Sequence, residues 1–144
     1  MRNKVSLASD NCSPVYPSII QAITEANDGY ATSYGGDFWT EQVESLFKEV
    51  FQRGMKTLLV PSGTGSNVLA LKLACKRHES VLCSEIAHIL VAESGAAESV
   101  VGVKLIPVFS ENGKIYPAEI VKKLKQERLS GKHATSPRVL SVTQ

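Results

Sequence analysis

From residue 57 onward, short apolar segments alternate with longer segments of helical periodicity. Strands are expected at 57–60, 80–84, 103–108 and 138–142, and helices at 66–76, about 93–100 and 117–129. Alternating strands and helices build a parallel sheet through right-handed crossovers, with helices on its faces. The pattern predicts an α/β fold, a three-layer sandwich with a mostly parallel sheet. The helix at 66–76 is apolar almost all round, which predicts burial on both sides.

Two further helices are expected before this alternation begins. Pro17 can open the first, which carries an apolar stripe and ends at Asn27-Asp28-Gly29. Residues 30–36 are polar, aromatic and glycine-bearing, so a loop is expected there. Asp37 is a suitable N-cap for the second helix, whose apolar residues recur at helical spacing up to Gly54.

The stretch from Leu58 to Asn67 is the strongest functional signal in the chain. Its expected strand breaks at Pro61, and a turn with the sequence Ser62-Gly63-Thr64-Gly65 leads into the next helix. Glycines let the backbone approach a ligand closely, and the first amides of a helix have no intrahelical acceptors. The helix dipole adds partial positive charge at the same place, which favours a phosphate group. The turn predicts a site for a phosphorylated small molecule; a tight turn that binds nothing is the alternative.

Two familiar phosphate loops fit these residues poorly. A P-loop needs Lys followed by Ser or Thr after its last glycine, whereas Gly65 is followed by Ser66 and Asn67. A dinucleotide-binding loop needs a third small residue where Val68 stands, although Glu85 lies near the position of a ribose-binding acid. A nicotinamide-binding domain is therefore kept only as an alternative.

Composition excludes several other classes of function. The chain has 144 residues, 43% of them hydrophobic, which suits one globular domain or part of a larger one. The net charge of +2 with no dense basic stripe argues against nucleic acid as a partner. No apolar run approaches membrane-spanning length, and the N-terminus lacks a signal-peptide core. Three cysteines without metal-like spacing predict reduced thiols, no metal site and a cytoplasmic location.

His88 is the first candidate for chemistry, because it follows the strand at 80–84. Ligands on parallel sheets bind at the carboxyl ends of the strands, where a flat imidazole could stack on a cofactor ring. Glu93 follows closely and could bond to the imidazole. The alternatives are a histidine that satisfies local hydrogen bonds and an acid that favours a helix N-terminus.

Together these pieces resemble one family. Ser9-Asp10, Tyr34-Gly35-Gly36-Asp37, Pro61 to Asn67, Ala87-His88 and Glu93-Ser94-Gly95-Ala96-Ala97 occur in the order seen in threonine aldolases. These enzymes belong to the β-eliminating lyase group of pyridoxal-phosphate enzymes, which have the aspartate-aminotransferase-type fold. The resemblance covers almost the whole chain and matches only the amino-terminal part of the family's large domain. It implies pyridoxal 5'-phosphate as cofactor and cleavage of a β-hydroxy amino acid to glycine and an aldehyde.

The resemblance assigns roles around the cofactor. Ser62, Gly63 and Thr64 look like the phosphate cradle. His88 looks like the catalytic ring that stacks on the pyridine and helps to handle the substrate hydroxyl. Glu93 looks like an auxiliary residue near the cofactor.

Three further residues receive roles in the same way. Ser9 falls near the family's serine for the substrate carboxylate. Tyr34 resembles a tyrosine given to the neighbouring subunit's active site, which implies a homodimer or homotetramer with shared sites. His133 aligns with a second family histidine, ahead of the last strand, and is carried over as catalytic.

The resemblance also divides the chain. Residues 1–36 are expected to form an N-terminal segment with a helix and an active-site loop, and residues 37–144 the first part of the cofactor-binding large domain. The rest of the large domain and the small domain are expected to be absent. The family's Schiff-base lysine would lie beyond Gln144, as would its pyridine-binding aspartate and carboxylate-binding arginine. A non-catalytic fragment or assembly partner therefore stays as an alternative, and so does β-elimination as the reaction.

Overall fold

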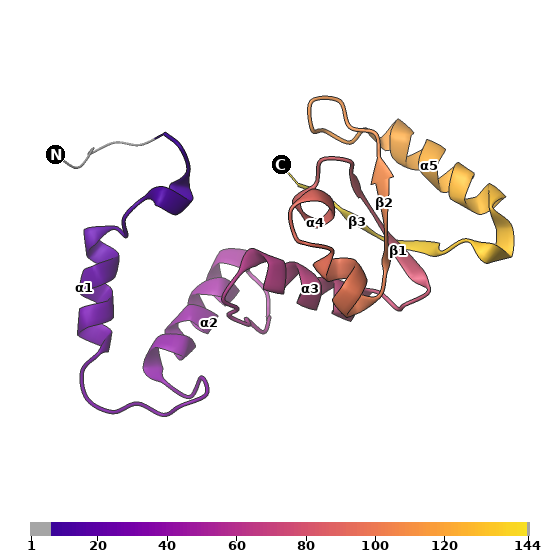
Figure 1. Ribbon diagram of the computed structural model, residues 1–144. Coiled ribbons are helices and arrows are strands. Elements are labelled where there is room, and N and C mark those ends of the chain that lie inside the picture. The colour runs from indigo at the N-terminus through magenta and orange to yellow at the C-terminus, as the bar shows by residue number, and fades with distance from the viewer. Residues whose placement is uncertain (1–6, 144) are drawn as a thin grey trace. The chain divides into compact units, whose positions relative to one another are not determined.

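The computed structural model describes residues 7–143, which separate into two compact units that divide between Leu58 and Leu59. The first unit is helical, and the second contains the sheet (Figure 1). The expected division after residue 36 falls in the loop before the second helix, and this domain division stays a prediction.

The first unit contains the two helices expected from the sequence. A short turn of 3-10 helix, η1 (Asp10–Cys12), precedes α1 (Pro17–Ala26) and α2 (Phe38–Phe51). Pro17 opens α1 as predicted. Asp37 caps α2, because its Oδ1 accepts a hydrogen bond from the Thr40 amide at 2.9 Å and its Oδ2 accepts one from the Thr40 hydroxyl at 2.7 Å.

The second unit is built on three parallel strands in the order β2-β1-β3. Along the chain it contains α3 (Gly63–Ala74), β1 (Glu79–Ser84), α4 (His88–Val91), the π-helical turn η2 (Ala97–Val101), β2 (Lys104–Val108), α5 (Pro117–Leu129), η3 (Gly131–His133) and β3 (Ser136–Ser141). Val81 lies opposite Leu105 on one side and Val139 on the other. The predicted parallel sheet is confirmed.

Alternating side chains of the strands feed two separate cores. On one face Val81, Cys83 and Leu105 pack with Leu71 of α3 and Val101 of η2. On the other face Leu82, Ile106 and Val108 pack with half-buried apolar residues, among them Ile120 and Leu124 of α5. Because successive strand residues point to opposite faces, both faces need an apolar cover, and helices supply it. The three-layer α/β architecture is therefore confirmed.

The expected strand at 57–60 is wrong. This segment has no regular secondary structure and no partner in the sheet, and the side chains of Leu58 and Leu59 are exposed. A strand needs a neighbour for its backbone hydrogen bonds, and none of the described strands pairs with these residues. An apolar run alone therefore did not make a strand.

Two other expectations need correction. Leu71 is the only buried apolar member of α3, whereas Leu69 and Leu73 are exposed, so this helix is not buried on both sides. The expected single helix near 93–100 is a turn followed by η2, and His88 opens the separate short helix α4. Ser94 and Gly95 both have positive φ, 52° and 68°, which interrupts the helix there.

Candidate active site

The N-terminus of α3 forms the predicted turn. The hydroxyl of Ser62, the N-cap, accepts a hydrogen bond from the Gly65 amide at 3.1 Å. A Cβ added at Gly63 would meet no atom within 4 Å, so the space over this residue is open. The amides of Gly63 and Thr64 belong to the first turn and have no acceptor within the helix. These donors and the dipole of a twelve-residue helix favour an anion at this point.

His88 and Glu93 are joined directly. The Nδ1 atom of His88 lies 2.7 Å from Oε1 of Glu93. The Glu93 side chain is completely buried, whereas the His88 side chain is 61% exposed. An ionised carboxylate can only accept hydrogen bonds, so the proton of a neutral imidazole is on Nδ1. The exposed ring then presents Nε2 with a free lone pair, which can accept a proton from a bound molecule.

Asn67, to which the sequence assigned no role, contacts the same carboxyl group. Its side-chain amide nitrogen donates to Oε1 of Glu93 at 2.7 Å. Oε2 of Glu93 is buried and has no hydrogen-bond partner among the described residues. A buried acceptor that is left unpaired costs free energy, so this oxygen calls for an explanation such as a catalytic role or a bound molecule. In the sequence, Asn67 is the last residue of the Leu58–Asn67 stretch, and nothing there indicated a partner for its side chain.

The fold explains why these residues meet. β1 delivers His88 just beyond its carboxyl end, and η2 packs against α3 in the shared core. The reversal at Ser94 and Gly95 lies between α4 and η2, next to Glu93, whose carboxyl group accepts the bond from Asn67 of α3. Positive φ at Ser94 is unfavourable for a residue with a side chain, and such strain is frequent at functional sites. The phosphate turn and Asn67 thus lie on successive turns of one helix.

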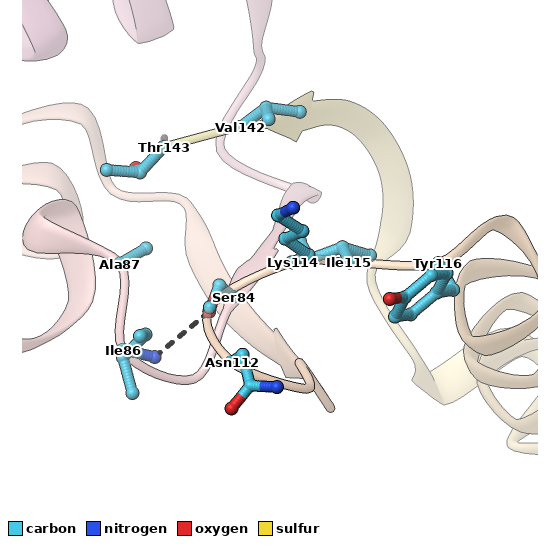
Figure 2. Close-up of a pocket in the computed structure, with 10 residues that line it drawn as sticks. Ser84, Ile86, Ala87, Asn112, Lys114, Ile115, Tyr116, Val142 and Thr143 are labelled. Carbon is cyan, nitrogen blue, oxygen red and sulfur yellow. Dashed lines mark hydrogen bonds between the residues drawn. The ribbon is translucent and has the colours of Figure 1, made fainter.

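A separate pocket lies at the same edge of the sheet. Its volume is about 630 Å³, and its lining includes Ser84, Ala87, Tyr116 and Thr143 (Figure 2). The hydroxyl of Ser84 accepts a hydrogen bond from the Ile86 amide at 3.2 Å in this lining (Figure 2). The pocket is lined by none of the residues predicted to bind cofactor or substrate. His88, Glu93 and Asn67 are thus not part of its lining, although Ala87, the neighbour of His88, is.

The three remaining predicted site residues lie elsewhere. Ser9 and Tyr34 belong to the first unit, where the hydroxyl of Ser9 accepts a hydrogen bond from the Asn11 amide at 3.2 Å. Tyr34 has an exposed side chain and a φ of 60°. His133 is exposed on η3, before β3, and so lies at the amino ends of the parallel strands, opposite the edge that carries His88. The structure does not bring His133 to the His88 cluster, and the roles of all three residues stay predictions.

The two buried cysteines, Cys75 and Cys83, contribute no reactive group to this site. Burial raises the pKa of the Cys83 thiol to about 11, and the charge of Glu98 adds to the shift. Burial also raises the pKa of Cys75. Both thiols are therefore protonated at neutral pH. Over residues 7–143, no cluster of three or more His, Cys, Asp or Glu side chains could hold a metal ion. None of the helices in the same range has the length and apolar character needed to cross a bilayer.

Comparison with known proteins gives concordant matches. A family model described as beta-eliminating lyase matches residues 6–144. Low specificity L-threonine aldolases from Pseudomonas sp. (strain NCIMB 10558) and Pseudomonas aeruginosa are each 38% identical over 139 residues. That alignment covers 95% of this chain but 39% of each relative, so the chain spans well under half of their length.

A solved structure of a Leishmania major threonine aldolase agrees with these matches. It aligns with a TM-score of 0.83 and 25% identity, over 91% of this chain and 38% of the other. The agreement confirms that the α/β unit has the fold of such an enzyme's first part. Because the family model also covers nearly every residue, the resemblance found in the sequence is confirmed: the chain belongs to the beta-eliminating lyase family.

Proposed function

We propose that the complete protein is a pyridoxal-phosphate-dependent carbon–carbon lyase of the threonine aldolase type. It cleaves a β-hydroxy amino acid to glycine and an aldehyde. The observation that carries this proposal is the exposed His88 imidazole, held by buried Glu93 at 2.7 Å beyond the carboxyl end of β1. The similarity to low specificity L-threonine aldolases supports it.

The residues at the start of α3 fit the phosphate of this cofactor. The open space over Gly63 and the unpaired first-turn amides suit a dianionic group, and Thr64 adds a hydroxyl. The unpaired Oε2 of Glu93 could accept a hydrogen bond from a polar group of a molecule that is bound near His88. When bound, pyridoxal phosphate would supply an electron sink for the electrons released at the substrate Cα. Ser62, Gly63, Thr64, His88 and Glu93 are the residues that would hold it.

His88 would move the proton. Its Nε2 takes the proton of the substrate β-hydroxyl as the Cα–Cβ bond breaks, so that the β-carbon leaves as an aldehyde and the bonding electrons remain at Cα. Glu93 keeps the hydrogen on Nδ1 and stabilises the imidazolium that forms. The exposed ring face can at the same time stack on a flat group. The protein's contribution is thus orientation and one proton transfer.

The remaining assignments extend the same proposal. Ser9 would bind the substrate carboxylate, Tyr34 would serve the neighbouring subunit's site, and His133 would assist catalysis. The role of Tyr34 implies a homodimer or homotetramer, and the enzyme would act in the cytoplasm on amino acids. Membership of the beta-eliminating lyase family favours this reading over a nicotinamide-binding domain.

The test uses the full-length protein with added pyridoxal phosphate. We expect a new absorption band on binding, and release of glycine and acetaldehyde from threonine or allo-threonine. His88→Ala should lower kcat by about 100-fold or more, as loss of a general base does. His78→Ala is the matched control, because His78 is exposed in the turn before β1. Thr64→Val should weaken cofactor binding.

The outcomes separate the alternatives. A wild-type protein that binds no pyridoxal phosphate would favour a non-catalytic assembly partner. Saturable binding of a nicotinamide dinucleotide instead would favour a nicotinamide-binding domain. Wild-type kcat in both His88→Ala and His78→Ala would overturn the role of His88.

A further inference from the structure

Asn67 and His88 are bound to one and the same oxygen atom. The Asn67 amide nitrogen and the His88 Nδ1 atom each lie 2.7 Å from Oε1 of Glu93. The carboxyl group is fully buried, and Oε2 has no partner among residues 7–143. Asn67 is therefore the sole side chain, apart from His88 itself, that fixes the rotation of this carboxyl group within the described structure.

We propose that Asn67 is a positioning residue for His88, acting through Glu93. This inference rests on the proposed function, because it assumes that His88 Nε2 is the proton acceptor. The amide of Asn67 can only donate from its nitrogen, so Oε1 faces it as an acceptor. That arrangement places the lone pairs of Oε1 between Asn67 and the imidazole. The carboxyl group is thereby held toward the ring, where it keeps hydrogen on Nδ1 and leaves a lone pair on Nε2. Without Asn67 the carboxyl group is free to turn away from the ring, and the imidazole then loses the acceptor that selects this tautomer.

The position of Asn67 on α3 gives this link its geometric meaning. Asn67 lies one turn beyond the Ser62–Thr64 phosphate turn on the same helix. A helix of twelve residues is rigid over one turn, so the phosphate turn and Asn67, which binds Glu93, keep a fixed separation. The hydrogen bonds that join Asn67, Glu93 and His88 then set the position of the imidazole relative to a group bound at the phosphate turn. Side chains held by such a second layer of hydrogen bonds are more precisely oriented than exposed ones.

A purely structural role is the competing explanation. In that case the bond from Asn67 to Glu93 would only join α3 to the segment before η2, and its loss would lower stability without changing His88. The two explanations differ in what happens at the ring nitrogens. A measurement that identifies which nitrogen carries the hydrogen therefore distinguishes them.

The experiment uses the full-length protein with ¹⁵N-labelled histidine. Two-bond ¹H–¹⁵N correlation spectra report which ring nitrogen is protonated in the neutral imidazole, and His88→Gln identifies the signal. Asn67→Leu removes the donor at similar volume, and Asn67→Ala removes it with a smaller side chain. Lys72→Leu is the control, because Lys72 is exposed on the same helix. Steady-state kinetics with pyridoxal phosphate and threonine are measured on the same samples.

We expect the wild type and Lys72→Leu to show hydrogen on Nδ1 only. Both Asn67 variants should show a mixture of tautomers, with kcat lowered about 10-fold and KM changed less than about 2-fold. An unmixed Nδ1 tautomer in the Asn67 variants would overturn the proposal, as would the same mixture in Lys72→Leu. Loss of the folded state in both Asn67 variants would assign Asn67 a structural role and would also overturn it.

The two hypotheses fail in different ways. The tautomer signal needs no turnover, so it tests the link from Asn67 to His88 even if the wild type cleaves no β-hydroxy amino acid, which would overturn the proposed function alone. An active wild type whose Asn67 variants keep both tautomer and kcat would overturn the role of Asn67 alone.

Discussion

The hydroxyl groups of Ser84 and Ser110 lie 2.7 Å apart in the interior and join the segments that leave β1 and β2. Two backbone contacts reinforce this junction, since the Glu85 amide donates to the Val108 carbonyl at 3.3 Å and the Ser110 amide donates to Oε1 of Glu85 at 3.4 Å. The start of the segment that leads to His88 is therefore fixed by hydrogen bonds as well as by packing.

Removing one of these hydroxyl groups should destabilise the protein. Ser84→Ala leaves the buried Ser110 hydroxyl without its partner, which costs about 1–2 kcal/mol in the free energy of unfolding. The double variant with Ser110→Ala should cost less than the sum of the single variants, because no hydroxyl is then left unpaired. Urea unfolding of the full-length protein measures these values, with exposed Ser99→Ala as control. Strictly additive costs would contradict a direct interaction between the two hydroxyls.

Glu93→Gln should separate activity from stability. The substitution keeps the shape and an acceptor oxygen but removes the negative charge that stabilises a protonated His88. We expect kcat to fall about 10- to 100-fold, while the thermal midpoint does not fall because a buried, half-paired carboxylate is itself costly. Steady-state kinetics and thermal unfolding of the full-length protein measure both, with exposed Glu98→Gln as control. Equal loss of activity in the two variants would argue against a specific role for Glu93.

Cys83 should make stability fall at alkaline pH. Burial raises its folded-state pKa to about 11, whereas an exposed thiol titrates near pH 8.5. The folded state thus prefers the neutral thiol, and this contribution is fully present below about pH 8.5 and lost as the pH rises through about 11. The unfolding midpoint measured across this range should decline less steeply in Cys83→Ala. Parallel pH curves for the two proteins would refute the assignment.

Asp37 should make α2 sensitive to acid. Hydrogen bonds from the Thr40 side chain and amide hold the pKa of Asp37 below its usual value. Its stabilising contribution is therefore present above the usual carboxyl range and lost as the pH falls through the lowered value. Asp37→Asn keeps an acceptor for the Thr40 amide but cannot titrate, so its thermal midpoint should depend less on pH. Circular dichroism melts at neutral and acidic pH provide the comparison.

Strong local signals predicted most of the fold. Pro117 at the start of α5 and the apolar run of β1 each determine their structure within a few neighbours, and the expected elements are confirmed there. The predictions failed where the structure of a segment depends on contacts with residues that are distant in the sequence. Residues 57–60 lack a strand to pair with, and the burial of α3 depends on which face meets the sheet.

The candidate site shows the same limit of local information. His88 and Glu93 were predicted because they lie close together in the sequence after a strand, and the 2.7 Å contact between them is present. The contact of Asn67 with Glu93 depends on the packing of η2 against α3. The hydrophobic periodicity of the sequence does not predict this packing. The positive φ of Ser94 was not predicted either, because serine has no preference for that conformation.

The strand order β2-β1-β3 has a consequence for the newly made chain. The central strand and β2 are synthesised first and can pair, but the second edge of β1 has to wait until β3 leaves the ribosome. During that interval Val81, Leu82 and Cys83 present an unpaired, apolar strand edge, which is prone to join other chains. Closing the sheet then requires the crossover through α5 to bring β3 back to β1, and such non-local pairing is slow. The nascent polypeptide should therefore be most prone to aggregation at this stage.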